Sequence, residues 1–293
     1  PRISKTLTQK LMNASDLVVV TGSQDNVRRA YSSGKPAIGV GLGNAPVIID
    51  ETADLADAAA KIRLSKTFDN ATSCSSENSI IIVDSAYDAA IDALKAEGAY
   101  LANADEKRKI QDTLWIDGKL NRHVIAKDPD IFAEVSELPN EAKKAKFFLV
   151  EETGAGSDYP FSGEKLSLAL TIYRARDFDD AIEIVKKILA YQGAGHSCGL
   201  HSTNSDHTRK LAEELDVVRV LVNQAHAIGN GGAFNNGLNF TLSMGCGTWG
   251  GNSITENLNY RNFINITHLS TVIPDETPNE EDLFGAYFAR HGQ

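Results

Sequence analysis

Short apolar runs alternate along the chain with longer segments in which apolar and polar residues recur at helical spacing. The runs are rich in Val and Ile, as buried strands are, and lie at residues 16–20, 37–40, 47–49, 80–83, 147–150, 168–173 and 198–201. Helices are predicted at residues 24–30, 54–64, 87–98 and 178–191. Repeated alternation of strand and helix indicates an α/β protein with parallel sheets.

Three segments depart from this alternation. Residues 103–145 are charged, with few apolar anchors, and are predicted to form a solvated helical layer. Residues 223–240 are rich in Gly and amide side chains and are predicted to form a loop. Residues 263–273 resemble a strand, and after them Thr277 as N-cap, Pro278 and Glu280 predict a helix start with a capping box. The apolar face of that helix carries Leu283, Phe284, Tyr287 and Phe288.

The composition is that of a globular protein large enough for two domains, with 293 residues of which 42% are hydrophobic. A net charge of −10 without a basic run disfavours nucleic-acid binding. Three separated cysteines without a CxxC pair indicate no disulfide framework and no metal site, and they fit a cytoplasmic environment. No stretch approaches the roughly 20 apolar residues of a membrane span.

Two local patterns carry candidate chemistry. The run at 16–20 breaks at Thr21-Gly22-Ser23 into a helix, and the free amides of a helix N-terminus favour phosphate. Cys74 lies among small hydroxyl residues ahead of the run at 80–83, on a loop where backbone amides can bind an oxyanion. Cys74 alone fits either a nucleophile or a core thiol, whereas Cys198 and Cys246 are interpreted as core or supporting thiols.

Several motifs occur in one order and together resemble the CoA-acylating branch of the aldehyde dehydrogenase superfamily, over residues 1 to about 270. They are Thr21–Ser23, Gly39–Pro46, the Cys74 segment, Glu164–Ser167, Gly195–His196 and Gly245–Ser253. The resemblance implies an aldehyde dehydrogenase-like α/β fold, with a parallel-sheet catalytic domain and the closing part of a Rossmann-type cofactor domain. The expected units are residues 1–62 (cofactor domain), 63–255 (catalytic domain) and 256–293 (oligomerisation strand and helix).

The resemblance also implies an activity and its site. Cys74 would attack an aldehyde to form a thiohemiacetal, hydride would pass to NAD or NADP, and the thioester on Cys74 would be transferred to CoA. Thr21, Gly22 and Ser23 match the turn beside the cofactor phosphate and nicotinamide, and Glu164 matches the carboxylate that holds the nicotinamide ribose. Members of this branch assemble through the chain end, so a homodimer or higher homo-oligomer is expected.

Position 40 distinguishes acylating from hydrolytic members. Aligning the turn on Gly43 and Pro46 places Val40 where hydrolytic enzymes carry a glutamate base. Valine cannot accept a proton, and general-base assistance is typically worth about 10²–10⁴-fold. Slow hydrolysis would leave the thioester for CoA, unless another group acts as base.

His196 and three asparagines complete the candidate site. A histidine occupies the Gly195-His196 position in the acylating branch, so His196 is a candidate partner for the CoA thiol or for Cys74, or else a structural residue. In the loop at 223–240, Asn230, Asn235 and Asn236 are candidates to bind a small anionic tail such as a sulfonate, unless this is an ordinary surface loop. The preferred substrate is sulfoacetaldehyde, with succinate semialdehyde and acetaldehyde as alternatives.

The chain begins at Pro1, without the first half of the cofactor domain that the resemblance leads one to expect. Two further hypotheses therefore stand beside the enzyme. The chain could be a non-catalytic domain that serves assembly, which would bind no nicotinamide cofactor. It could also be a thiol acyltransferase or esterase that uses Cys74 without a cofactor.

Overall fold

The structure, a computed structural model, describes residues 4–292 and divides into two compact units, Pro1–Asn262 and Phe263–Gln293. The larger unit is built on a seven-stranded sheet, and the smaller unit carries helix α10 (Glu280–His291). None of the helices in the described residues is long and apolar enough to cross a membrane. The predicted α/β class with parallel sheets is confirmed.

The seven-stranded sheet is parallel throughout. Its spatial order is β11 (Val220–Val222), β10 (Cys198–His201), β3 (Ala45–Ile49), β4 (Glu77–Val83), β9 (Ala169–Ala175), β8 (Phe147–Glu151) and β5 (Ala99–Leu101). Central strand β4 is buried along its whole length, with Ile80 and Ile82 in one hydrophobic cluster and Ile81 in the other. Both faces are therefore covered, as the unbroken apolar run of a parallel strand predicts.

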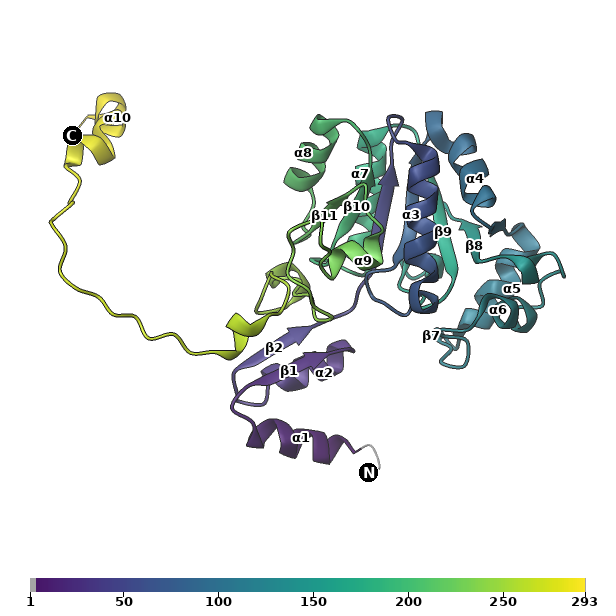
Figure 1. Ribbon diagram of the computed structural model, residues 1–293, viewed down its shortest axis with the longest axis horizontal. Helices are drawn as coiled ribbons and strands as arrows, with labels where there is room; N and C mark the ends of the chain where they lie inside the picture. Colours follow the sequence, from purple (N-terminus) through teal and green to yellow (C-terminus); the bar gives the residue numbers. More distant parts are fainter. Residues whose placement is uncertain (1–3, 293) are drawn as a thin grey trace. The chain divides into compact units, whose positions relative to one another are not determined.

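Helices cover the two faces of this sheet (Figure 1). The face of Ile80 and Ile82 packs against α3 (Leu55–Thr67), α4 (Tyr87–Ala96), α5 (Ala104–Leu114) and α6 (Pro129–Val135). The face of Ile81 packs against α7 (Phe178–Tyr191) and α8 (Ser205–Glu214). The short helix α9 (His226–Asn230) contacts both α3 and β11. The result is a three-layer α/β/α arrangement.

A smaller βαβ unit precedes this sheet. Strands β1 (Val18–Thr21) and β2 (Ala37–Val40) pair in parallel, and helix α2 (Gln24–Tyr31) connects them. Helix α1 (Lys5–Ala14) packs Met12 into the small hydrophobic cluster of this unit. The two-stranded sheet ends at Val40. The next strand along the chain, β3, belongs to the large sheet, where it is fully buried between β10 and β4. The range 1–62, expected to be the cofactor domain, thus also contains β3 and part of α3 of the large sheet.

The prediction that residues 103–145 form a solvated layer is wrong for their inner face. The charged helix α5 buries Ile110 and Leu114, and α6 buries Phe132, all in the cluster against the sheet. The small hairpin β6 (Trp115–Ile116) and β7 (Lys119–Leu120) follows α5. The apolar anchors are few, but they are spaced so that each meets the same cluster. Most charged residues face outward, whereas Glu106 is buried and accepts a hydrogen bond from the Tyr100 hydroxyl.

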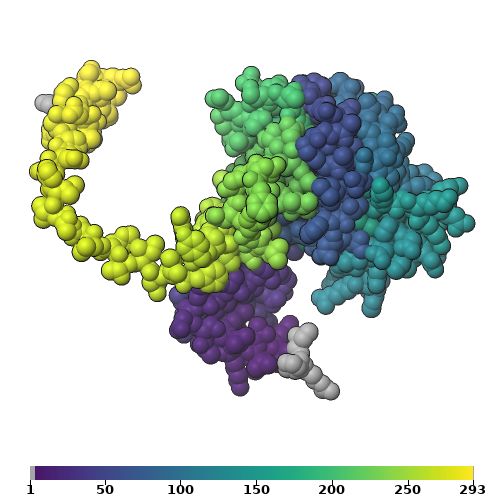
Figure 2. All heavy atoms as spheres, viewed as in Figure 1, coloured from purple at the N-terminus to yellow at the C-terminus, as the bar shows by residue number. Residues whose placement is uncertain are grey.

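The C-terminal unit differs from its prediction in two ways. No strand forms over residues 263–273, because no other part of the described chain pairs with that segment. Figure 2 shows these residues as a single extended run of atoms. The helix begins at Glu280 with Asn279 as N-cap rather than Thr277, since the Asn279 side chain accepts a hydrogen bond from Asp282 N.

Substitution of Phe132 tests whether α6 belongs to the core. Phe132 is 0% exposed and its neighbour Ile131 is 44% exposed. Phe132→Ala should lower the free energy of unfolding by about 3–5 kcal/mol, because it leaves a cavity against the sheet. Ile131→Ala, the matched control, should change it by about 0.5 kcal/mol. Urea unfolding followed by circular dichroism measures both, and equal effects would contradict the assignment of Phe132 to the core.

Candidate active site

The candidate site lies at the amino ends of the strands of the seven-stranded sheet. Because all seven strands run the same way, the residues that precede them meet at their amino ends. Gly43 precedes β3, Cys74 precedes β4, Glu164 precedes β9 and His196 precedes β10. Ligands of open α/β sheets usually bind at the carboxyl ends of the strands. This site lies at the other end of the strands.

Cys74 opens onto a cavity of about 540 Å³. The cavity is lined by Thr21, Gly22, Ser23, Gly41, Leu42, Gly43, Phe68, Asp69, Thr72, Ser73, Cys74, Glu164, Leu166, Ala227, Gly231, Thr241, Leu242 and Met244. Cys74 is partly exposed there, whereas Cys198 and Cys246 are buried. Among the three thiols, Cys74 alone lines the cavity, so it is the one that a substrate can reach.

The backbone holds Cys74 closely. A Cβ added to Gly43 would collide with the Cys74 carbonyl oxygen and lie 2.6 Å from the Cys74 Cβ. Position 43 therefore requires glycine, and the turn before β3 presses on the nucleophile loop before β4. On the other side of Cys74, the hydroxyl of Ser75 donates to the sulfur of Met244 at 3.3 Å.

Opposing effects set the protonation of Cys74. Burial and then the charge of Glu164 raise the pKa of its thiol, while the Ser75 hydroxyl and the charge of Arg219 lower it. Burial likewise raises the pKa of Glu164 to about 7, against a hydrogen bond from the Gly43 amide. Glu164 thus lines the cavity as a carboxyl group that titrates near neutral pH.

Thr21, Gly22 and Ser23 line the same cavity, at the start of α2. Gly22 has φ +138°, and nothing lies within 4 Å of where its Cβ would be. Ser23 is the N-cap of α2, and its Oγ accepts from Asn26 N at 3.4 Å. An open glycine turn at a helix N-terminus, with Glu164 across the cavity to accept hydroxyl hydrogens, fits the phosphate and ribose of a nicotinamide cofactor.

Val40 is buried in β2, where it pairs with Thr21. It does not line the cavity, whose carboxyl groups are those of Asp69 and Glu164. The turn that follows Val40 lines the cavity through Gly41, Leu42 and Gly43. Val40 is thus a buried strand residue, and its alignment with the glutamate of hydrolytic enzymes stays a prediction.

His196 lies beside the cavity rather than in it. It is fully buried, its Nδ1 lies 2.7 Å from Ser197 Oγ, and its Nε2 has no protein partner in the described residues. Burial and the positive charge of Arg219 lower its pKa to about 3, so the imidazole is neutral at physiological pH. A direct part in catalysis remains a prediction for His196.

The three predicted asparagines do not line the cavity. Asn230 is fully buried, and its Nδ2 donates to Ser75 Oγ at 2.9 Å and towards Ser197 Oγ at 3.3 Å. Asn236 donates to Gln224 and Gly229 within its own loop, and Asn235 is exposed. Helix α9 turns Asn230 inward, and this segment reaches the cavity through Ala227, Gly231, Thr241 and Leu242 instead.

The sequence analysis missed Ser75 and Arg219. Ser75 O accepts from His226 Nδ1 at 2.8 Å, so this residue is held by backbone and side chain alike. Arg219 donates from Nε to Asn230 Oδ1 at 2.8 Å. The position of Ser75 beside Cys74 was a visible signal, whereas an isolated arginine ahead of a short strand was not.

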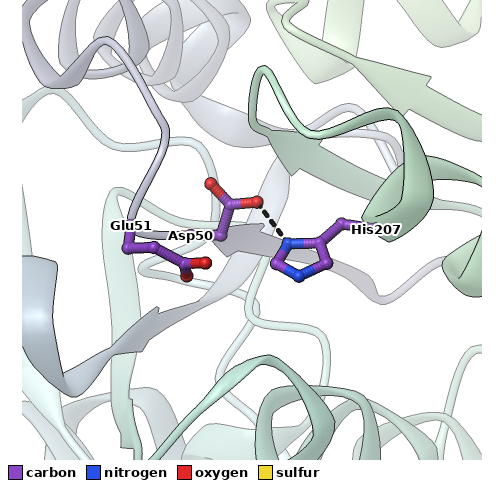
Figure 3. A group of neighbouring side chains, drawn as sticks. All are labelled: Asp50, Glu51 and His207. Atoms are coloured by element: carbon purple, nitrogen blue, oxygen red, sulfur yellow. Dashed lines mark hydrogen bonds and ion pairs between the residues drawn. The ribbon is translucent and has the colours of Figure 1, made fainter.

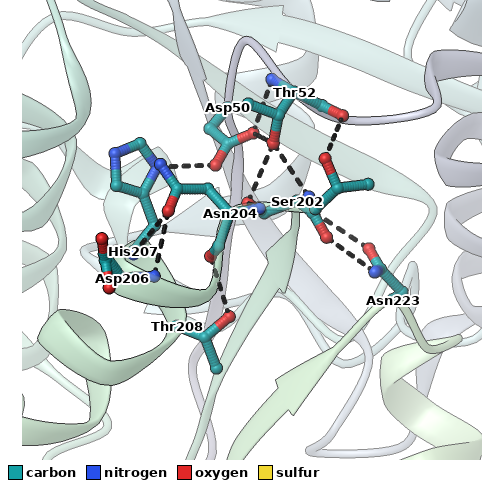
Figure 4. A network of polar contacts seen from close by, with 9 residues as sticks. Asp50, Thr52, Ser202, Asn204, Asp206, His207, Thr208 and Asn223 are labelled. Carbon is teal, nitrogen blue, oxygen red and sulfur yellow. Dashed lines mark hydrogen bonds and ion pairs between the residues drawn. The ribbon is translucent and has the colours of Figure 1, made fainter.

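A second polar cluster lies at the carboxyl ends of the strands, away from the cavity. There Asp50, Glu51 and His207 come together, and Asp50 Oδ2 lies 2.7 Å from His207 Nδ1 (Figure 3). The other oxygen of Asp50 accepts from the amide of Thr52 at 2.8 Å and from its hydroxyl at 2.7 Å. The network continues through Ser202 to Asn204 and Asn223 (Figure 4).

This cluster is a structural brace. Burial raises the pKa of Asp50, but hydrogen bonds from Ser202, His207 and Thr52 outweigh burial and lower it below its ordinary value. The His207 ring stacks on Phe178 at 3.8 Å. Both oxygens of the Asp50 carboxylate already accept hydrogen bonds from protein groups. The cluster therefore joins β3, β10 and α8 without needing a metal ion.

Comparison with known proteins shows the family of the chain. Residues 3–112 match the model of the aldehyde dehydrogenase family. The chain is 54% identical to an acylating sulfoacetaldehyde dehydrogenase of Cupriavidus necator, over 99% of this chain and 59% of that protein. It is 40% identical to an acylating sulfoacetaldehyde dehydrogenase of Bilophila wadsworthia, over 99% of this chain and 63% of that protein.

Among solved structures, an acetylating aldehyde dehydrogenase from Geobacillus thermoglucosidasius superimposes with a TM-score of 0.88 at 34% identity, covering 94% of this chain and 61% of that one. The α/β architecture is that of the acetylating aldehyde dehydrogenase structure, and Cys74 lies at the amino ends of its strands. The chain belongs to the aldehyde dehydrogenase family. It spans about three fifths of the length of the relatives it matches.

Glu164 predicts a pH-dependent effect on Cys74. The pKa of Glu164 is about 7. Above that pH the Glu164 carboxylate is ionised and opposes the Cys74 thiolate, and below that pH Glu164 is neutral. Glu164→Gln should therefore speed the alkylation of Cys74 by iodoacetamide about three- to tenfold near pH 8.5 and leave the rate near pH 6 unchanged.

Peptide mass spectrometry measures the rate at Cys74. Asp69→Asn removes the other carboxyl group of the cavity and is the matched control, because Asp69 is not among the groups that shift the pKa of Cys74. If Glu164→Gln had the same effect at both pH values, or none at either, the assigned electrostatics would be wrong.

Proposed function

We propose that the complete protein is a CoA-acylating aldehyde dehydrogenase, which oxidises a short aldehyde to its acyl-CoA with NAD or NADP. The observation that carries the proposal is the cavity at the amino edge of the sheet. It presents Cys74, the Gly22–Ser23 turn and Glu164 together, and the strand residue before its Gly41–Gly43 turn is the apolar Val40. The names of the relatives support the same reaction.

In the first half-reaction Cys74 is the nucleophile. Its thiol loses the proton, Sγ bonds to the aldehyde carbon, and the carbonyl becomes the oxyanion of a thiohemiacetal, towards which the Cys74 amide is a candidate donor. NAD(P)⁺, when bound, accepts the hydride that leaves this carbon. A thioester then remains on Cys74.

In the second half-reaction the acyl group leaves Cys74 for CoA. The sulfur of CoA bonds to the thioester carbon, the Cys74 thiolate departs, and the sum of both halves is aldehyde, NAD(P)⁺ and CoA giving acyl-CoA, NAD(P)H and a proton. Water competes poorly, because Val40 offers no base where a hydrolytic enzyme has its glutamate. For His196, buried and neutral, a role in CoA deprotonation stays part of this proposal.

Thr21, Gly22, Ser23 and Glu164 are proposed to bind the cofactor, the turn at its phosphate and the carboxylate at the nicotinamide ribose. Sulfoacetaldehyde is the proposed substrate, with succinate semialdehyde and acetaldehyde as alternatives. Ser73 lines the cavity, and its hydroxyl accepts from Ser75 N, so its own proton can be donated to an oxygen of a sulfonate or carboxylate. We assign the protein to the cytoplasm, consistent with its three free cysteines.

We also propose that residues 256–293 mediate a homo-oligomer. Along the extended part of this segment the apolar side chains are exposed, Leu269 by 91% and Val272 by 100%. A strand-like run of this kind is completed when a second copy supplies the pairing strand. The apolar face of α10, with Leu283, Phe284 and Tyr287, is exposed as well.

Turnover by the complete protein tests the proposal. With sulfoacetaldehyde, CoA and either cofactor, absorbance at 340 nm should rise, and Cys74→Ala should lower kcat/KM at least about a thousandfold. Cys198→Ser is the matched control, since this thiol is buried away from the cavity. Retained activity in Cys74→Ala, or turnover to free acid that is independent of CoA, would contradict the proposal. A panel with the alternative aldehydes identifies the substrate.

A further inference from the structure

Arg219 is a buried cation that forms no ion pair with an acidic side chain among residues 4–292. It lies directly before β11, and the residue is only 6% exposed. Its guanidinium donates to Asn230 Oδ1 at 2.8 Å, to Gly245 O at 2.7 Å and to Thr255 O at 3.0 Å. These three acceptors are neutral, and no carboxylate is among the groups that shift its pKa. A buried charge is costly unless something opposes it, so this one calls for a negative group nearby.

A chain of hydrogen bonds leads from Arg219 to the neighbour of the nucleophile. Because Asn230 Oδ1 accepts from Arg219, the amide orientation is fixed and Nδ2 must donate. It donates to Ser75 Oγ at 2.9 Å, which leaves the Ser75 proton free to point elsewhere, as it does towards Met244. Arg219 thereby sets which way the hydroxyl beside Cys74 can donate.

The charges that face Cys74 come from several elements. Glu164, before β9, opposes a thiolate, while Arg219, before β11, favours it. Asp69 lines the cavity from the segment after α3, and Cys246 lies in the turn whose carbonyl groups hold Arg219. His226 of α9 and His196 are neutral near pH 7, because burial lowers their pKa values to about 4 and about 3. Arg219 is thus the cation of this surrounding set that stays charged.

We propose that Arg219 is a positioning residue for the nucleophile: its buried positive charge favours the Cys74 thiolate, and its hydrogen bond to Asn230 holds the amide that binds Ser75, the residue after Cys74. The inference rests on the proposed function only in taking Cys74 as the nucleophile. Two thiols favour the charged form of Arg219, first that of Cys246 and then that of Cys74. Of the two, Cys74 lines the cavity, so in the proposed reaction its thiolate and the thiohemiacetal oxygen formed on it are the negative groups that this charge stabilises.

A purely structural Arg219 would tie β11 to the turns at Gly245 and Thr255 and leave the chemistry of Cys74 alone. The two roles separate in the pH dependence of thiol alkylation, because the thiolate is the reactive form. The rate at Cys74 is measured with iodoacetamide on the complete protein, by peptide mass spectrometry. Buried Cys198 reports in the same samples whether each variant is folded.

Two variants remove the effect in different ways. Arg219→Gln deletes the charge. Asn230→Asp keeps an acceptor for Arg219 but neutralises its charge and removes the donor to Ser75. In both, the midpoint of the alkylation profile should move up by about one pH unit, which lowers the rate near pH 7.5 about tenfold. Arg219→Lys keeps the charge and should restore the rate to within about threefold of the wild type.

Arg209→Gln, at an exposed position of α8, is the matched control and should leave the profile unchanged. If Arg219→Gln unfolds, Cys198 becomes labelled and reveals it. The midpoints of Asn230→Asp and Arg219→Lys then test the inference in its place. Wild-type midpoints in folded Arg219→Gln or Asn230→Asp would overturn the inference, as would an Arg219→Lys variant as slow as Arg219→Gln. A shifted midpoint in a protein without aldehyde oxidation would leave this inference standing and remove the proposed function.

Discussion

The parallel pairing of β3, β4, β9 and β10 is the constraint on which the site depends. One common strand direction places the residues before each strand at one edge, so segments distant in sequence deliver Gly43, Cys74, Glu164 and His196 to one place. The contact between Gly43 and the Cys74 backbone then fixes the nucleophile against the next turn. At the opposite, carboxyl end of the strands the Asp50–His207 brace joins β3, β10 and α8 and takes no part in the cavity.

Charged groups are also buried where α3, β4 and α9 meet. Beneath the cavity Lys66 donates to Glu77 O at 2.8 Å, and Glu77 Oε1 accepts from His226 N at 3.2 Å, which anchors α9. Burial lowers the pKa of Lys66 to about 7 and raises that of Glu77 to about 7. Such groups are costly in a core, and here they hold the helix that carries Asn230. Stability is given up where the nucleophile loop must be held in place.

Sequence reasoning found most of the sheet, because the apolar runs of β3, β4, β8, β9 and β10 are short, rich in β-branched residues and buried on both faces. It missed β5 and β11, three residues each, whose pairing depends on neighbours distant in sequence. It placed Cys74, Glu164 and the Thr21–Ser23 turn on one cavity, since ordered motifs carry that information. It did not foresee that Asn230 points inward to Ser75, because the direction of a side chain on a five-residue helix follows from tertiary packing.

The central claim is that Cys74 transfers its acyl group to CoA rather than to water. The most direct measurement is the mass of the Cys74 peptide after the complete protein has been mixed with sulfoacetaldehyde and NAD(P)⁺ and quenched in acid. Without CoA, one acyl group should persist on Cys74, and added CoA should remove it as acyl-CoA at least about a hundredfold faster than water does. An acyl group on another residue, no acyl group at all, or release to free acid at one rate with and without CoA would contradict the account.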